Sequence, residues 1–147
     1  MSRWRRLGRL AAGLVLAVGA SACGAPDRPN TDIRLWTDEF ELRAWPDVLP
    51  PRAGEPIRWT VTVRDKKTKA PIANGEGRIF ATNEDRKTAW QGFTYGPEVG
   101  TYHAELVYVT AGDWAMGIQF RRDSTRALQR TTDWRQTVRN AADPGTP

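Results

Sequence analysis

The chain has 147 residues, of which 27% are charged and 10% aromatic, and its formal net charge at pH 7 is +5. Four of its 22 basic residues lie within the first nine positions, so the remaining 18 face all 17 acidic residues and leave a charge of about +1. This length suits one domain whose core needs no disulfide. A near-neutral remainder without a basic block gives no support for nucleic-acid binding.

The first 22 residues have the composition of a secretory signal peptide. Four arginines precede the apolar run LAAGLVLAVGA, which ends in small residues. The run is too short to span a bilayer, which needs about 20 apolar residues. We therefore expect an export signal over residues 1–22 and not a transmembrane helix.

The only cysteine, Cys23, ends the sequence ASAC at residues 20–23. This sequence resembles the bacterial lipobox, although Ala20 stands where leucine is commoner. The resemblance implies cleavage before Cys23 and lipid on its thiol and new amino group, palmitate included; ordinary signal cleavage nearby is the alternative. The protein would then be anchored in the cell membrane or the outer membrane, facing the periplasm or the cell exterior. Residues 23–37, rich in Pro, Gly and Asp at their start, are predicted to be the lipidated cysteine and its tether.

From residue 38 onward, apolar residues recur with a period of two, which is typical of strands with one buried face. The clearest case is IRWTVTVR at residues 57–64. The segment 124–140 is ambiguous, because Ala127 and Leu128 could open a short helix, whereas the alternation around Trp134 favours a final strand. A hairpin with a four-residue loop is expected between the two strands on either side of TAGD. The predicted strands lie at residues 40–44, 57–64, 77–81, 90–95, 101–109, 114–120 and 134–138.

About seven strands separated by turns, without a long amphipathic helix, predict an all-β fold. We expect a single immunoglobulin-like antiparallel β-sandwich over residues 38–140 and a disordered tail at residues 141–147. Gly100 and Tyr102, at the start of a late strand, are similar to the tyrosine corner of such sandwiches. The alternative is that Tyr102 is simply a core aromatic residue.

Two long segments, AGEPIRWTVTVRDKKTKAPIANGEGRIF and EVGTYHAELVYVTAGDWAMGIQF, resemble the bacterial YtkA-like family, which is related in pattern to FixH-like domains. The resemblance covers about residues 38–122. It implies an extracytoplasmic, immunoglobulin-like domain without catalytic residues, associated in relatives with the assembly of respiratory oxidases and, in some, with copper handling. The matching residues are Pro71, Ile72, Gly75, Gly100, Tyr102, Ala104, Ala111, Gly112 and Trp114.

The sequence offers few ligands for copper, because soft copper sites use several Met, His or Cys side chains. After the signal there is one histidine, His103, predicted to point outward, and one methionine, Met116, predicted to point inward. Cys23 is expected to carry lipid. We therefore predict no metal site and no cofactor in this chain, unless a partner supplies ligands.

The inventory of side chains also gives no support for an enzyme. Ser124 and His103 are the only serine and histidine after the signal, and Ser124 lies in a polar turn, so a catalytic triad would be a coincidence. The carboxylate pairs at residues 38–39 and 84–85 are more typical of a solvated surface than of a hydrolase cleft.

Three aromatic residues fall outside the inward pattern and are the candidates for partner binding: Trp45, Trp90 and Tyr95. The alternative is that they cap open ends of the sandwich. The sequence thus predicts a membrane-anchored, non-catalytic binding or assembly module of the cell envelope, with a protein partner that could belong to a respiratory complex. A periplasmic copper-handling protein and a structural or adhesive envelope domain are the alternatives.

Overall fold

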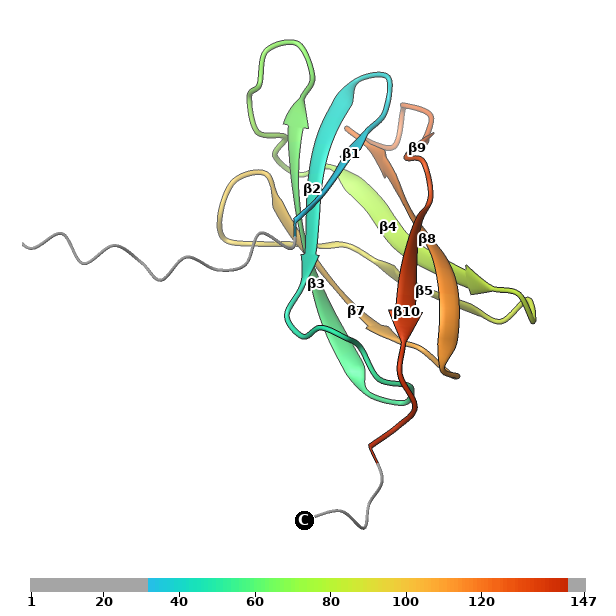
Figure 1. Ribbon diagram of the computed structural model, residues 1–147. Helices are drawn as coiled ribbons and strands as arrows, with labels where there is room; N and C mark the ends of the chain where they lie inside the picture. The colour runs from blue at the N-terminus through green and yellow to red at the C-terminus, as the bar shows by residue number, and fades with distance from the viewer. Residues whose placement is uncertain (1–31, 143–147) are drawn as a thin grey trace, which may run out of the picture.

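Ten β-strands form the regular structure of residues 32–142, the part of the chain that the computed structural model describes (Figure 1). They build two antiparallel sheets packed as a β-sandwich, which confirms the predicted all-β fold. None of the described residues form a helix long and apolar enough to cross a bilayer. The predicted signal peptide, Cys23 and residues 143–147 of the predicted tail lie outside the described residues.

Sheet 1 has the strand order β1–β2–β3–β7–β6, and sheet 2 has the order β10–β8–β4–β5, with β9 paired to β8. Without β1 and β9, these orders match A-B-E-D and G-F-C-C′ of immunoglobulin-like sandwiches. The strands of sheet 1 are β1 (Ile33–Trp36), β2 (Phe40–Pro46), β3 (Pro56–Asp65), β6 (Thr94–Tyr95) and β7 (Thr101–Val107). Those of sheet 2 are β4 (Glu76–Asn83), β5 (Thr88–Gly92), β8 (Gly112–Arg121), β9 (Gln129–Arg130) and β10 (Trp134–Val138).

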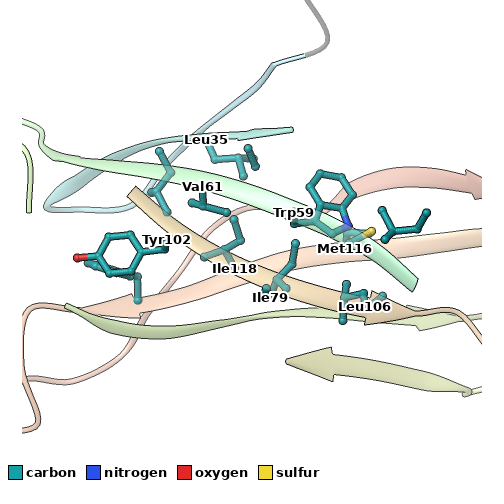
Figure 2. Close-up of a cluster of buried hydrophobic side chains, with 14 of the residues drawn as sticks. Leu35, Trp59, Val61, Ile79, Tyr102, Leu106, Met116 and Ile118 are labelled. Carbon is teal, nitrogen blue, oxygen red and sulfur yellow. The ribbon is translucent and has the colours of Figure 1, made fainter. Parts of the chain in front are cut away.

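The core lies between the sheets and is built from the inward residues of the alternating strands (Figure 2). In β3, every second residue from Ile57 to Val63 is buried, as the period of two predicts. Aromatic side chains join the two sheets: Phe120 of β8 makes edge-to-face contacts with Phe40 and Tyr102, at centroid distances of 5.0 and 5.2 Å. Aromatic contacts of this kind add stability beyond the apolar area that they bury.

The structure has three strands more than predicted, and two of them arise where a prediction is corrected. The predicted strand at residues 90–95 is two strands: β5 ends at Gly92 in sheet 2, and β6 begins at Thr94 in sheet 1. The chain therefore changes sheet at Phe93. At the N-terminal end, β1 starts at Ile33, inside the predicted tether, so the sandwich begins five residues before the predicted boundary.

The predicted hairpin between β7 and β8 is wrong. The two strands lie in different sheets: β7 pairs with β3 and β6, and β8 pairs with β4, β9 and β10. The inward pattern of each strand is correct, since Leu106, Tyr108, Trp114 and Met116 are all buried. The alternation of apolar residues shows which side of a strand is buried, but not which strand lies beside it. The same alternation therefore fits a connection that crosses from one sheet to the other as well as a hairpin within one sheet.

Tyr102 is fully buried but does not form the predicted tyrosine corner. Its hydroxyl donates to the carbonyl oxygen of Ile72 (2.6 Å) and accepts from the amide of Gly75 (2.9 Å). These partners lie about thirty residues upstream, in the β3–β4 connection, whereas a tyrosine corner closes on backbone a few residues away. Tyr102 therefore fastens the connection between the two sheets.

The final ambiguity is settled in favour of strands. Residues 134–138 form β10, paired with β8, and Ala127 and Leu128 lie in the loop before β9 instead of in a helix. The alternation of buried Val138 with exposed Thr137 is the pattern that predicted this strand.

Asp65, at the end of β3, links the two sheets at the same end as Tyr102. Its carboxylate accepts hydrogen bonds from the amides of Lys67 and Thr68 (both 2.8 Å) and contacts the guanidinium of Arg122, just after β8. The two amides, first Thr68 and then Lys67, and the Arg122 contact lower the pKa of Asp65 to about 2.

Candidate binding surface

The three predicted partner-binding residues do not form one patch. Trp45 is half-buried on the outer face of sheet 1, where it lies opposite Thr60. Trp90 lies on the outer face of sheet 2, on the other side of the sandwich, with 62% of its surface exposed. Tyr95 packs against Tyr102, with ring centroids 5.2 Å apart, at the margin of the core. Only Trp90 of the three presents a large exposed aromatic face.

Trp90 is the centre of an arrangement of aromatic and guanidinium groups on sheet 2. It lies on the edge strand β5, directly opposite Phe80 of β4. The guanidinium carbon of Arg78 stands 5.8 Å from the centre of the Trp90 ring. Arg78 is held there because its Nε donates to the side-chain oxygen of Gln119 (2.7 Å). This cation–π contact orients both side chains without covering the indole.

Phe80 is fixed beside Trp90 by a second contact of the same kind. The guanidinium carbon of Arg130 lies 4.7 Å from the centre of the Phe80 ring, and Arg130 donates two hydrogen bonds to Asp133 at 2.9 and 3.0 Å. The ring lies over Gly117, where a Cβ atom would stand only 2.5 Å from Phe80 Cζ. The missing side chain at Gly117 therefore allows Phe80 to lie flat on the sheet. We call Arg78, Phe80, Trp90, Arg130 and Asp133 the Trp90 surface.

A hollow of about 590 Å³ adjoins the Trp90 surface. Its lining includes Ala115, a small residue on the outer face of β8, as well as Phe80. The Arg135–Asp113 ion pair (3.4 Å) also lines it, and Thr137 donates to Asp113 (2.6 Å). The outer face of sheet 2 thus combines a flat aromatic platform, a depression, and charged groups that are already paired.

This arrangement suits the burial of an apolar or aromatic group of a partner. Trp and Arg are the residues that most often dominate the energy of protein interfaces. Because Arg130 and Arg135 already have carboxylate partners, covering them leaves no isolated charge. The guanidinium of Arg78 has no carboxylate within ion-pairing distance among residues 32–142, so it is available to a carboxylate or carbonyl oxygen of the partner.

Two exposed or half-exposed aromatic residues were missed at the sequence level. Phe80 lies between buried Ile79 and Ala81, so the same out-of-phase argument that found Trp90 would have found it. Trp36, 51% exposed, lies in β1, which the sequence analysis assigns to the tether, where no alternation of apolar residues is expected. Trp36 is on the outer face of sheet 1, away from the Trp90 surface.

His103 and Met116 take the directions that the sequence predicted. His103 lies on the outer face of β7, where its Nδ1 is 3.3 Å from the hydroxyl of Thr60. Met116 is buried, and its sulfur accepts a hydrogen bond from Tyr108 (2.9 Å). No group of three His, Cys, Asp or Glu side chains that could hold a metal ion occurs in residues 32–142. Ser124 lies in the β8–β9 loop of sheet 2, whereas His103 belongs to sheet 1.

Comparison of the chain with protein-family models and with curated proteins gives no match.

Proposed function

We propose that this protein is a lipid-anchored, non-catalytic binding module of the cell envelope, whose Trp90 surface contacts a protein partner. The observation that carries the proposal is the exposure of Trp90, at 62% of its surface, beside Phe80, with Arg78 over the Trp90 ring and Arg130 over the Phe80 ring. An exposed tryptophan costs solvation free energy that a covered one does not. An exposed tryptophan that lies beside a second aromatic ring, Phe80, on paired strands is typical of a contact surface.

The proposed location of the module rests on the sequence at the N-terminus. Lipid on Cys23 would hold the sandwich at a membrane, with nine residues, 24–32, between the anchor and β1. The resemblance to YtkA-like and FixH-like domains favours a partner in the assembly of a respiratory complex. Ser124 and His103, the only serine and histidine after the predicted signal, belong to different parts of the sandwich, which favours binding over catalysis.

The test is co-purification of the tagged full-length protein from its own membranes in mild detergent. Trp90→Ala is compared with Trp36→Ala, which removes an equally large exposed indole from the opposite face. We expect recovery of the partner to fall about tenfold or more with Trp90→Ala and to stay unchanged with Trp36→Ala. Equal recovery with both variants contradicts the assignment of the surface.

The anchor is tested separately in the same preparation. Mass spectrometry of the purified chain should find acyl chains on Cys23, and Cys23→Ala should move the protein out of the membrane fraction. An unlipidated wild-type protein contradicts the anchor. A lipidated wild type that is recovered without any partner contradicts the binding module.

A further inference from the structure

We propose that the outer face of sheet 1 binds the anionic phospholipid headgroups of the membrane that carries the anchor. This proposal rests on the lipid anchor of the proposed function and adds an orientation to it. The face centres on three arginines from neighbouring strands: Arg34 of β1, Arg43 of β2 and Arg64 of β3. We call these three residues the arginine face.

The three arginines share one side of the sheet. Arg34 lies directly opposite Arg43, and Arg64 lies opposite Glu41, two residues before Arg43 on the same strand. Their neighbours along each strand, such as Leu35, Leu42 and Val63, are buried on the inner side. Because residues opposite each other on paired strands point to the same face, all three guanidinium groups point away from the core.

In the described part of the chain, the three arginines outnumber the two carboxylates near them, which are Glu41, opposite Arg64, and Asp32, in the same hollow as Arg43 and Arg64. Among residues 32–142, the arginine face makes no ion pair within 4 Å, although Glu41 is held by Lys69 at 2.7 Å. On sheet 2, Arg121, Arg130 and Arg135 are paired with carboxylates, and Arg78 is the arginine of its described strands without such a pair. Like charges directly opposite each other destabilise a strand pair. A ligand that supplies negative charge would remove this cost at Arg34 and Arg43.

The electrostatic environment of Glu41 is consistent with this excess. Its pKa lies below the ordinary value, first because of the hydrogen bond from Lys69 and also because of the charges of Arg43 and Arg64. The same groups border a hollow of about 390 Å³ that also includes Asp32, Thr62 and Trp45. Arginine forks and a hydroxyl around a shallow depression are suited to phosphate oxygens.

The tether and the tryptophans favour a membrane surface as the source of the phosphate. Nine residues can span at most about 30 Å, and they lead from Cys23 into β1, the edge strand of this same sheet. Trp36 and Trp45 lie on the outer face beside the arginines, and tryptophan is enriched at the level of lipid headgroups. Each arginine near an anionic bilayer shifts the ratio of docked to undocked protein by about fivefold. With sheet 1 on the membrane, the Trp90 surface of sheet 2 faces away from it.

The test measures the accessibility of single thiols in the lipidated full-length protein on vesicles. Because lipid blocks Cys23, Thr62→Cys on sheet 1 or Thr82→Cys on sheet 2 supplies the only free thiol. Both threonines line a hollow on the outer face of their sheet, which makes them a matched pair. The vesicles contain phosphatidylcholine alone or with one-third phosphatidylglycerol, and the rate of reaction with a hydrophilic maleimide is recorded.

We expect phosphatidylglycerol to slow labelling at Thr62→Cys about tenfold or more and to leave Thr82→Cys unchanged. Adding Arg34→Gln and Arg43→Gln, or 0.5 M salt, should restore the rate. If Thr62→Cys is labelled at the same rate on both kinds of vesicle while Cys23 carries lipid, the membrane-binding proposal is wrong. The proposal that the Trp90 surface binds a protein partner is not affected by that result. If labelling of Thr62→Cys slows as the protein concentration rises, the arginine face contacts a second copy of the chain, and the membrane-binding proposal is again wrong. A free Cys23 overturns the anchor and this proposal together.

Discussion

Replacing Tyr102 with phenylalanine should destabilise the sandwich by about 2 kcal/mol. The change removes one hydroxyl that donates to Ile72 and accepts from Gly75, and it keeps the ring packed against Phe120. The carbonyl of Ile72 is then buried without a donor, which costs about 1–3 kcal/mol, whereas the Gly75 amide is only partly buried and loses less. For a domain of this size, about 2 kcal/mol lowers the melting temperature by about 8 °C.

The assay is urea unfolding followed by tryptophan fluorescence, with Tyr95→Phe as the matched control. The Tyr95 hydroxyl makes no hydrogen bond with the residues that the structure describes, so its removal should change the free energy of unfolding by less than about 0.5 kcal/mol. The dependence of that free energy on urea should be the same for wild type and both variants. A loss at Tyr102 no larger than at Tyr95 would refute the claim that this hydroxyl fastens the β3–β4 connection.

Three further predictions concern the binding surface, the core and the Asp65 turn. Gly117→Ala puts a methyl group 2.5 Å from Phe80 Cζ, so it should displace Phe80 and lower partner recovery several-fold, while urea unfolding shows a loss below about 1 kcal/mol. Trp114→Ala should lower the free energy of unfolding by about 3–5 kcal/mol in the same assay, because the indole is fully buried and donates to the Thr110 carbonyl at 3.1 Å. A loss below about 1 kcal/mol would contradict the place of Trp114 in the core. The fold lowers the pKa of Asp65 from 3.8 to about 2. The ionised carboxylate therefore contributes fully to the free energy of unfolding above pH 3.8, and this contribution is lost as the pH falls towards 2. Melting curves of Asp65→Asn between pH 2 and 6 should lack this part of the acid destabilisation, and an unchanged pH profile would exclude Asp65 as its source.

The fold class could be predicted because burial alternates cleanly along most strands. In β2, β3 and β8 the inward residues form a nearly unbroken series, so the period of two predicts both the strand and its buried side. Pairing could not be predicted in the same way. β7 and β8 are neighbours in sequence, yet they lie in different sheets, because β7 pairs with β3 and β8 pairs with β4, in both cases between residues more than thirty positions apart.

The candidate site was predictable only in part. Trp90 could be found from the sequence because it is out of phase with its strand, but nothing in the sequence separates an exposed position on sheet 2 from one on sheet 1. Trp45 and Trp90 therefore looked alike until the strand order placed them on opposite faces. The arginine face was also hidden, since Arg34 and Arg43 become neighbours only through the pairing of β1, which the sequence assigned to the tether.

The strand order also limits how early each sheet can be completed during folding. β3 pairs with β7, so Thr60 must find His103 before sheet 1 exists beyond its first three strands. β8 pairs with β4 on one side and with β10 on the other, so sheet 2 is complete only when the last strand has formed. Topologies dominated by such distant pairs fold in milliseconds to seconds instead of microseconds. Sheet 1 therefore cannot be completed before β7 has formed, up to Val107, and sheet 2 cannot be completed before β10 has formed, up to Val138.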